Sequence, residues 1–453
     1  MLVADFPSTP AAWHQRIWHL TWPIILANVT IPLVGVADVA VMGRLSDPAY
    51  IASVAMGAAM FSAVYWLFGF LRMGTTGLTA QAFGAAKPTE ARAVFKRAVG
   101  IAGMLGLVIV LLQWPLSQLL FALFDANVRL TGLVEIYFDI RIFGAPALLI
   151  YLVALGVLFG LQRMRDTLWL SISLNLTNLV LDVVLVLGFD LGVAGVAIGT
   201  LISEIGAAVA GCWLVNRALR NLGGARPSRD QLWRKSAIRA LFYVSGNLII
   251  RTFFVQLPFF VGTVAATALG ELTLAAHAVL MQLFFIMTYT LDGFAHTAET
   301  LAGYAFGGKN AQALRKTTLY SAGWALGLAL MTAVVYWMAG AAFISWLTVN
   351  EAVRSTATDY LPWIVLSPLT CIAAFLLDGI FIGTTHIREM RNAMFASASL
   401  WALLLGLSYS ALGYHAIWFT MSIFMLTRGL LLALYYPRIE RAASGPADRA
   451  ILE

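Results

Sequence analysis

The sequence predicts an all-α membrane protein with twelve transmembrane helices in two six-helix lobes related by pseudo-symmetry. Sixty per cent of the residues are hydrophobic and 11% are charged, whereas soluble domains carry roughly 25% charged residues. Long apolar runs recur along the whole chain, and each can supply the roughly 20 residues that one helical crossing needs. The runs are continuous, whereas the strands of a membrane barrel alternate over roughly 10 residues.

In chain order, we expect the spans at 17–43, 51–80, 95–121, 132–160, 168–189, 193–216, 239–266, 272–302, 317–345, 357–383, 394–412 and 415–437. The first span is expected to be retained, because residues 1–16 contain charges and no small-residue cleavage pattern follows a short apolar core. Cys212 and Cys371 fall inside predicted spans and indicate neither a disulfide framework nor a metal site.

The basic residues predict the orientation. Of 29 Lys and Arg residues, most lie at the two termini, in the central loop or in the loops that follow the even-numbered spans. The opposite loops hold Arg44, Arg129 and Arg354, with Arg141 at an ambiguous helix edge. Because cytoplasmic loops are rich in Lys and Arg, we expect both termini in the cytoplasm of a cell with this chain in its inner membrane. This distribution, rather than nucleic-acid binding, explains the net charge of +7.

The two halves of the chain resemble each other. LFGFLRMGTTGLTAQAFG ends at Gly84, TLDGFAHTAETLAGYAFG ends at Gly307, and a basic segment follows each. We therefore expect an N-lobe at 1–222 with six helices, a cytoplasmic linker at 223–238, and a C-lobe at 239–453 with six more. Internal repeats are typical of secondary transporters, which bind substrate near the midplane between the repeats. The alternative is that duplication only produced a stable bundle.

An ionisable side chain at bilayer depth is a candidate for function, because it costs roughly 2.5–3.5 kcal/mol or more to insert. The first span carries Asp38 after Pro32 and Gly35. A proline inside a helix removes a backbone hydrogen bond and allows a kink, so protonation of Asp38 can be coupled to bending. The alternative is a structural acid near the outer end of the helix.

The fifth span places four polar residues on one helix face, which would be unfavourable against lipid. They are Ser171, Asn175, Asn178 and Asp182, at i, i+4, i+7 and i+11. We expect this stripe to line a cavity, although hydrogen-bonded contact between helices is an alternative for Ser and Asn. On the sixth span, Thr200, Ser203 and Glu204 are possible neighbours.

Other charges lie in the predicted spans. The eighth span carries Asp292, His296 and Glu299 on one face, and the tenth carries Asp378. Arginines occur in the second, seventh and twelfth spans, at Arg72, Arg251 and Arg428. One interpretation makes the acids secondary functional groups. Another pairs these charges structurally, for instance Arg251 with an acid of the eighth span.

Enzyme and nucleotide sites are not indicated. Gly303, Gly308 and Lys309 match most of a phosphate-binding loop, but Asn310 replaces the hydroxyl residue that binds Mg²⁺, and the motif follows a membrane helix rather than a strand. We found no metal-ligand cluster, nucleophile elbow or dinucleotide fingerprint. We therefore expect no enzyme, no nucleotide and no cofactor, and an ion gradient as the source of energy.

These segments resemble the multidrug and toxic compound extrusion (MATE) family, in its DinF branch. The resemblance covers most of the chain and is carried by VADVAVMG, FLRMGTTGLTAQAFG, NLVLDVVLVLG, LDGF followed by ETLAGYAFG, and LLDGIFIGTTHIREMRNAM. The last two segments are the most specific. The resemblance implies two six-helix lobes that open as a V and export of amphipathic, often cationic compounds in exchange for H⁺ or Na⁺.

The resemblance also implies a cation site in the N-lobe, at Asp38, Asn178 and Asp182, with Thr200 as a further member. A tyrosine that some relatives place one turn before the acid of the first helix is Val34 here, which changes the expected hydrogen-bond network. The C-lobe acid cluster of other branches is matched only in part here, by Asp378.

We thus predict a monomeric secondary exporter of amphipathic or cationic drugs that exchanges them for H⁺ by alternating access. Asp38, Asp182, Asn178 and Thr200 are the expected coupling residues. The alternatives are an antiporter coupled to Na⁺ and a flippase of lipids or lipid-linked sugars. A flippase would favour a basic cavity, whereas the polar stripe of the fifth span is acidic and amide-rich. A membrane enzyme and a channel fit the sequence less well.

Overall fold

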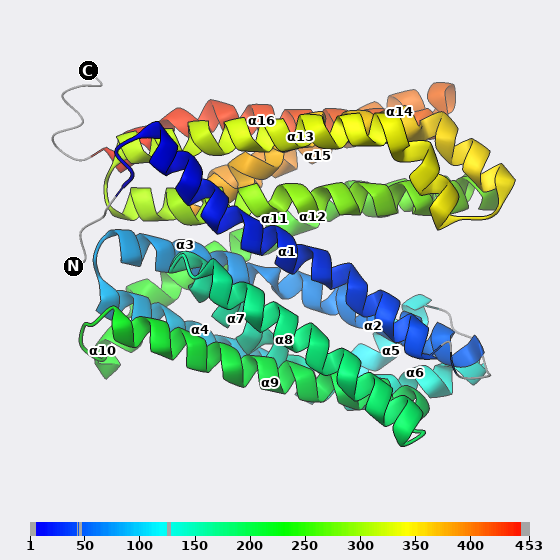
Figure 1. Ribbon diagram of the computed structural model, residues 1–453, viewed down its shortest axis with the longest axis horizontal. Coiled ribbons are helices and arrows are strands. Elements are labelled where there is room, and N and C mark those ends of the chain that lie inside the picture. The colour runs from blue at the N-terminus through cyan, green and yellow to red at the C-terminus, as the bar shows by residue number, and fades with distance from the viewer. Residues whose placement is uncertain (1–5, 43, 45–47, 125–127, 445–453) are drawn as a thin grey trace. The chain divides into compact units, whose positions relative to one another are not determined.

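The computed structural model describes residues 6–42, 44, 48–124 and 128–444, with only the backbone described for 31–40, 48, 123–124 and 128–129. Within these ranges the regular structure is entirely helical (Figure 1). The elements are α1 (Pro10–Met42), α2 (Pro48–Trp66), η1 (Leu67–Gly69), α3 (Phe70–Gly84), α4 (Pro88–Leu111), α5 (Gln113–Phe124), α6 (Val128–Arg141), η2 (Ile142–Gly144), α7 (Ala145–Gly160), α8 (Met164–Asp182), η3 (Val183–Gly188), α9 (Gly192–Asn221), α10 (Arg229–Leu232), α11 (Lys235–Ala268), α12 (Glu271–Gly307), α13 (Ala311–Leu347), α14 (Glu351–Gly383), α15 (Ile387–Leu412) and α16 (Tyr414–Ala443).

The membrane spans agree with the prediction. Among the described residues, eleven helical segments are long and apolar enough to cross a bilayer, and they coincide with the second to twelfth predicted spans. The first predicted span falls in α1, a helix of 33 residues. The prediction of an all-α polytopic membrane protein is therefore confirmed.

Several spans consist of two helical pieces, which hydropathy did not predict. A 3₁₀ turn, η1, separates α2 from α3, and Leu112 separates α4 from α5. The turn η2 separates α6 from α7, and Pro146 lies at the start of α7. Proline has no backbone N–H to donate, so it is tolerated in the first turn of a helix.

The helices also begin earlier than the apolar runs. For example, α4 begins at Pro88 and α14 at Glu351, whereas we predicted starts at 95 and 357. Capping interactions set the start of some helices. The side-chain oxygen of Asn310 accepts a hydrogen bond from the Ala313 amide, at 2.8 Å, ahead of α13. Polar first turns therefore extend the helices beyond the apolar segments.

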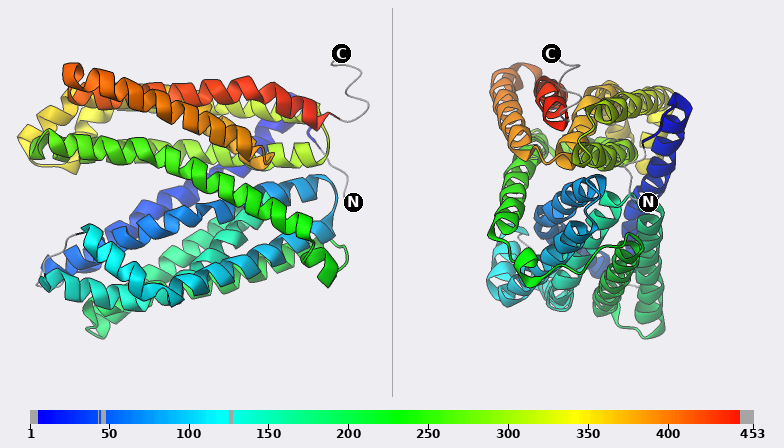
Figure 2. Two further views of the ribbon diagram at one scale, coloured as in Figure 1. Left: turned by 180° about the vertical axis from the view of Figure 1, so that it is seen from behind. Right: turned by 90° about the vertical axis from the view of Figure 1, so that its left-hand side faces the viewer.

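The described residues divide into two compact units, one within residues 26–241 and the other of 6–25 and 242–444 (Figure 2). Helix α1 is thus shared between them. Its first half packs in the second unit, where the Thr21 hydroxyl lies 2.8 Å from that of Thr297 on α12. The lobe bounds 1–222 and 239–453 stay a prediction, and residues 6–25 belong by their contacts to the second unit.

Both units contain the same close contact between two helices. In each, a pair of glycines four residues apart brings a helix so near its neighbour that an added Cβ would overlap the neighbour's backbone. The pairs are Gly156 and Gly160 of α7, facing Arg72 and Thr76 of α3, and Gly379 and Gly383 of α14, facing Ala295 and Glu299 of α12. Small residues at this spacing are typical of packed membrane helices, and the two sets correspond at one constant offset along the chain.

Left-handed backbone positions repeat at the same offset. Residues with positive φ occur after α3 and after α12, after α7 and after α14, and at the ends of the loops before α9 and α16. The pairs are Ala86 and Lys309, Gln162 and Thr385, and Asp190 and Gly413. The two units therefore repeat both helix packing and loop geometry, as the weak sequence repeat predicted.

Candidate functional site

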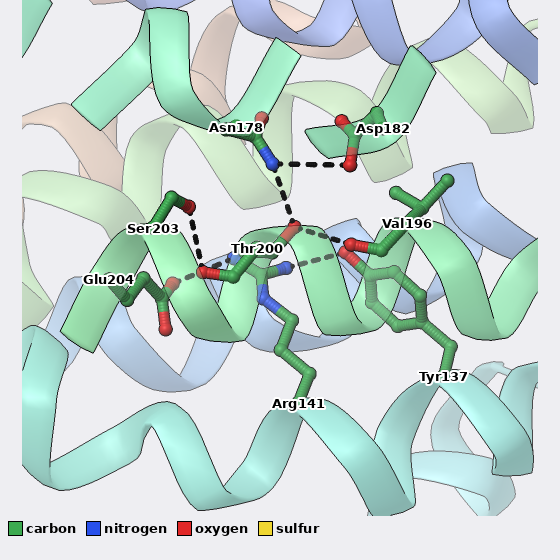
Figure 3. Close-up of polar contacts among 8 residues, drawn as sticks. All are labelled: Tyr137, Arg141, Asn178, Asp182, Val196, Thr200, Ser203 and Glu204. Carbon is green, nitrogen blue, oxygen red and sulfur yellow. Dashed lines mark hydrogen bonds and ion pairs between the residues drawn. The ribbon is translucent and has the colours of Figure 1, made fainter. Parts of the chain in front are cut away.

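A hydrogen-bonded network joins α8 to α9 inside the first unit. The side-chain amide of Asn178 donates to Oδ1 of Asp182, at 3.4 Å, and to the hydroxyl of Thr200, at 3.2 Å (Figure 3). The Thr200 hydroxyl lies 2.9 Å from the carbonyl oxygen of Val196, to which it donates. Asn178 is 4% exposed and Asp182 is fully buried. The structure thus brings together three of the residues that the sequence singled out.

The local backbone explains how Asp182 fits there. Helix α8 ends at Asp182, and the next six residues, Val183–Gly188, form a π-helical turn. Such turns are rare and occur frequently at functional sites. On α9, Gly199 faces the carboxylate, and an added Cβ there would overlap Oδ1 of Asp182. Glycine at position 199 therefore provides the space that the carboxylate occupies.

The same polar stripe of α8 reaches two further helices. Asn175 donates to the Thr30 hydroxyl of α1, at 2.8 Å, and to the Thr30 carbonyl, at 3.3 Å. The Ser171 hydroxyl lies 3.3 Å from the hydroxyl of Tyr151 on α7. The stripe therefore faces protein on three sides.

Asp38, Pro32 and Gly35 lie on α1, which is helical without a break from Pro10 to Met42. Their side chains lie outside the described residues.

A second buried charge pair lies beside this network. Arg141 of α6 is 3.5 Å from Oε1 of Glu204 on α9, one helical turn after Thr200. Arg141 also donates to the Tyr137 hydroxyl, at 2.8 Å, and lies 4.8 Å from the centre of the Phe61 ring. We had treated Arg141 as an ambiguous helix edge. Its position inside an apolar run, the same feature by which the sequence indicates Arg251, could have identified Arg141 as a buried charge.

The second unit contains a different charged cluster. Arg251 of α11 and Arg428 of α16 both donate to Oδ2 of Asp378 on α14, the latter at 2.5 Å. Asp378 is 6% exposed and Arg428 is 1% exposed. The suggested pairing of Arg251 with an acid of the eighth span is therefore wrong. The acid that Arg251 meets lies on α14, the tenth span, where Arg428 of α16 contacts the same carboxylate oxygen.

The remaining charged candidates lie on α12 and α3. On α12, His296 Nδ1 is 3.1 Å from Oε2 of Glu299, so two of the three residues on the predicted face of the eighth span meet. Asp292 lies one turn before His296 on the same helix. In the first unit, the guanidinium of Arg72 lies 5.4 Å from the centre of the Phe159 ring.

Comparison with known proteins identifies the family. The MatE family model matches residues 23–184 and again 248–407, once in each half of the chain. The chain belongs to the MatE family. Over 424 residues it is 36% identical to the DNA damage-inducible protein F of Escherichia coli, covering 94% of this chain and 92% of that protein.

Other members of the MatE family show more distant similarity. The multidrug export protein MepA of Staphylococcus aureus is 25% identical over 203 residues, 43% of each chain. The crystal structure of the Vibrio cholerae MATE transporter VcmN in its bent form has the same fold, with a TM-score of 0.85 at 18% identity, over 96% of this chain and 98% of that one. The protein is thus a membrane transporter of the multidrug and toxic compound extrusion family, and the DinF branch indicated by the sequence is confirmed.

Proposed function

We propose that this MatE protein exports amphipathic, cationic drugs in exchange for H⁺ by alternating access. In this proposal it acts as a monomer in the inner membrane, with both termini in the cytoplasm. The observation that supports the proposal is the fully buried carboxylate of Asp182, held by Asn178 next to Thr200 inside a membrane helix pair.

The two protonation states of Asp182 have opposing sources of stability. Burial away from water disfavours the ionised carboxylate, whereas the hydrogen bond from Asn178 favours it. Uptake of a proton removes the charge and weakens that hydrogen bond. Protonation at Asp182 therefore changes the contact between α8 and α9, which is the requirement for coupling a proton to a conformational change.

The contact between α1 and α8 relates Asp38 to this acid. Asn175 is bonded to Thr30, Asp38 follows Thr30 by two helical turns, and Asp182 follows Asn175 by the same. Both helices run outward in the predicted topology, and a rise of 1.5 Å per residue moves each acid about 10–12 Å from the contact. On this topology we expect the two acids at a similar depth, which supports their proposed action as a pair.

In the proposed cycle, Asp38 and Asp182 take up protons from outside in the outward-open state. Helix α1 then bends near Pro32 or Gly35 and displaces the drug, and the return to the inward-open state releases the protons to the cytoplasm. Substrate access alternates by movement of one repeat against the other.

Na⁺ is the second candidate for the coupling ion, because the site is rich in oxygen atoms. The Asp182 carboxylate and the Thr200 hydroxyl are hydrogen-bonded to the side-chain amide of Asn178, and the Val196 carbonyl is bonded to Thr200. The amide oxygen of Asn178 becomes available as a further ligand if the amide turns over. Against Na⁺, Val34 provides no oxygen where some relatives have a tyrosine. Two neighbouring acids also raise each other's affinity for a proton.

Replacement of the two acids tests the assignment. We expect Asp38→Asn and Asp182→Asn to abolish drug export, because neither amide can carry a proton. Asp190→Asn is the matched control, because it replaces the same carboxylate by the same amide at a position in the loop before α9. The measurement is drug resistance of cells that hold equal amounts of each variant in the membrane. Near-normal resistance with Asp182→Asn would contradict the assignment.

A further inference from the structure

Glu204 is a second buried acid in the first unit, with 4% of its surface exposed. Its Oε1 lies 3.5 Å from Arg141, which is long for an ion pair. Its Oε2 is buried, has no hydrogen-bond partner among the described residues, and faces Gly144, where an added Cβ would overlap it. A buried carboxylate oxygen without a donor is unfavourable in the ionised state, and a proton on that oxygen removes the charge.

Arg141 keeps other partners when Glu204 is neutral. Its guanidinium donates to the Tyr137 hydroxyl at 2.8 Å and lies 4.8 Å from the centre of the Phe61 ring. The face of an aromatic ring stabilises a cation, more so away from water. The positive charge is therefore retained without the carboxylate, so the pair with Glu204 can break and form again.

Among the residues that the structure describes, few other ionisable groups lie on the helices packed around this pair. Tyr65 of α2 and Tyr137 of α6 interact with Arg141, and Tyr65 also interacts with Glu204. On the neighbouring helices α7 and α8, Tyr151 is hydrogen-bonded to Ser171 and Asp182 to Asn178. The acids Glu135 and Asp139 of α6 are exposed. The arginines of α4 have other partners: Arg97 pairs with Glu90, and Arg92 donates to the carbonyl oxygens of Leu219 and Gly224, near and just after the end of α9. Arg141 is therefore the main partner that determines the charge of Glu204.

We propose that Glu204 is a second proton-carrying group of the transport cycle and that Arg141 is its retained counter-charge. The proposal rests on the proton coupling proposed above. In the ionised state Glu204 pairs with Arg141. A proton from the outer solution adds to a Glu204 carboxylate oxygen, the pair opens, and Arg141 stays on Tyr137 and Phe61. The same O–H bond breaks when the proton leaves for the cytoplasm.

The position of Glu204 connects this event to the first acid. Thr200 and Glu204 lie one turn apart on the same helix, and the Ser203 hydroxyl donates to the Thr200 carbonyl at 2.8 Å (Figure 3). Thr200 in turn accepts the hydrogen bond from Asn178. A shift of this turn of α9 when Arg141 releases Glu204 therefore acts directly on the Asp182 network.

The experiment counts the protons released when a drug binds. Purified protein in weakly buffered detergent solution receives tetraphenylphosphonium as the probe, and a pH-sensitive dye reports the release. We expect Glu204→Gln to release one proton fewer per protein than the unaltered chain, and Asp182→Asn with Glu204→Gln to release fewer still. An unchanged count with Glu204→Gln identifies a static ion pair and overturns the proposal.

Arg141 provides a second test that leaves the acid in place. Without the guanidinium charge, the ionised carboxylate loses its stabilising partner, so Arg141→Gln should move the midpoint of proton release to higher pH. Arg141→Lys keeps the charge and should leave the midpoint nearer that of the unaltered chain. Equal midpoints for all three proteins would contradict the proposed role. If the unaltered chain itself releases no protons, the proposed coupling to H⁺ fails instead.

Discussion

At the scale of single residues, the two units carry different charges on the same helix framework. At the offset that relates the glycine pairs, Asp182 corresponds to Leu405, Glu204 to Thr427, and Asp378 to Leu155. Among the described residues, the buried acids of the first unit are Asp182, which accepts a hydrogen bond from Asn178, and Glu204, 3.5 Å from Arg141. In the second unit Asp378 is held by two arginines, and Glu299 lies 3.1 Å from His296. We therefore assign the proposed proton binding to Asp182 and Glu204 rather than to Asp378, whose charge is balanced by two arginines.

Loss of the acid in the second unit should reduce stability. Asp378→Asn leaves two buried guanidinium groups without their carboxylate, and removal of one member of a buried ion pair costs about 3–5 kcal/mol. We expect a lower thermal unfolding temperature for the purified variant. Asp359→Asn is the control, because Asp359 lies exposed on the same helix, α14. Equal unfolding temperatures for the two variants would contradict a stabilising role for Asp378.

The acids of the site were predictable from the sequence, but their partners were not. An acid inside an apolar run is visible without a structure, and the spacing of Ser171, Asn175, Asn178 and Asp182 correctly placed them on one face of a helix. Periodicity does not say which helix packs against that face. For this reason Arg251 was suggested for the wrong acid, and the contact between Arg141 and Glu204 was missed.

At the scale of helices, hydropathy located the crossings but not their ends. The energy of transfer into lipid depends on the apolar run, whereas a helix ends where its backbone groups find other partners. Asn350, for instance, caps α14 by accepting hydrogen bonds from Ala352 and Val353, at 3.0 and 3.2 Å. Several helices therefore begin six or seven residues before the predicted span. These polar first turns lie outside the apolar runs, so hydropathy does not locate them.

Helix α8 should present two chemically different faces. Leu176, Val180 and Val184 are exposed, whereas Asn178 and Asp182 are buried against α9. We expect cysteines at 175, 178 and 182 to react with a polar thiol reagent added from outside in one state of the transport cycle. Cysteines at 176, 180 and 184, which face away, should not react. Equal labelling of both sets would place the water-accessible face elsewhere.

At the scale of the whole molecule, the duplication was visible in the sequence but the sharing of α1 was not. Similar segments ending at Gly84 and Gly307 indicated two lobes, and the repeated glycine contacts confirm the duplication in three dimensions. No local pattern shows that the first half of α1 packs in the second unit. The same helix contacts α8 through Thr30. The continuous backbone of α1 therefore connects the polar stripe of α8 in the first unit with the residues of α1 that pack in the second unit.

The central claim is that a proton gradient alone drives drug export, and transport in proteoliposomes tests it directly. Vesicles that contain the purified protein and ethidium are placed in sodium-free solution that is acidic on the side corresponding to the cell exterior. We predict ethidium efflux above that of protein-free vesicles. An Asp182→Asn preparation should show no such efflux. Background efflux under this gradient, with transport appearing only when Na⁺ is supplied on the same side, would contradict the proton-coupled account.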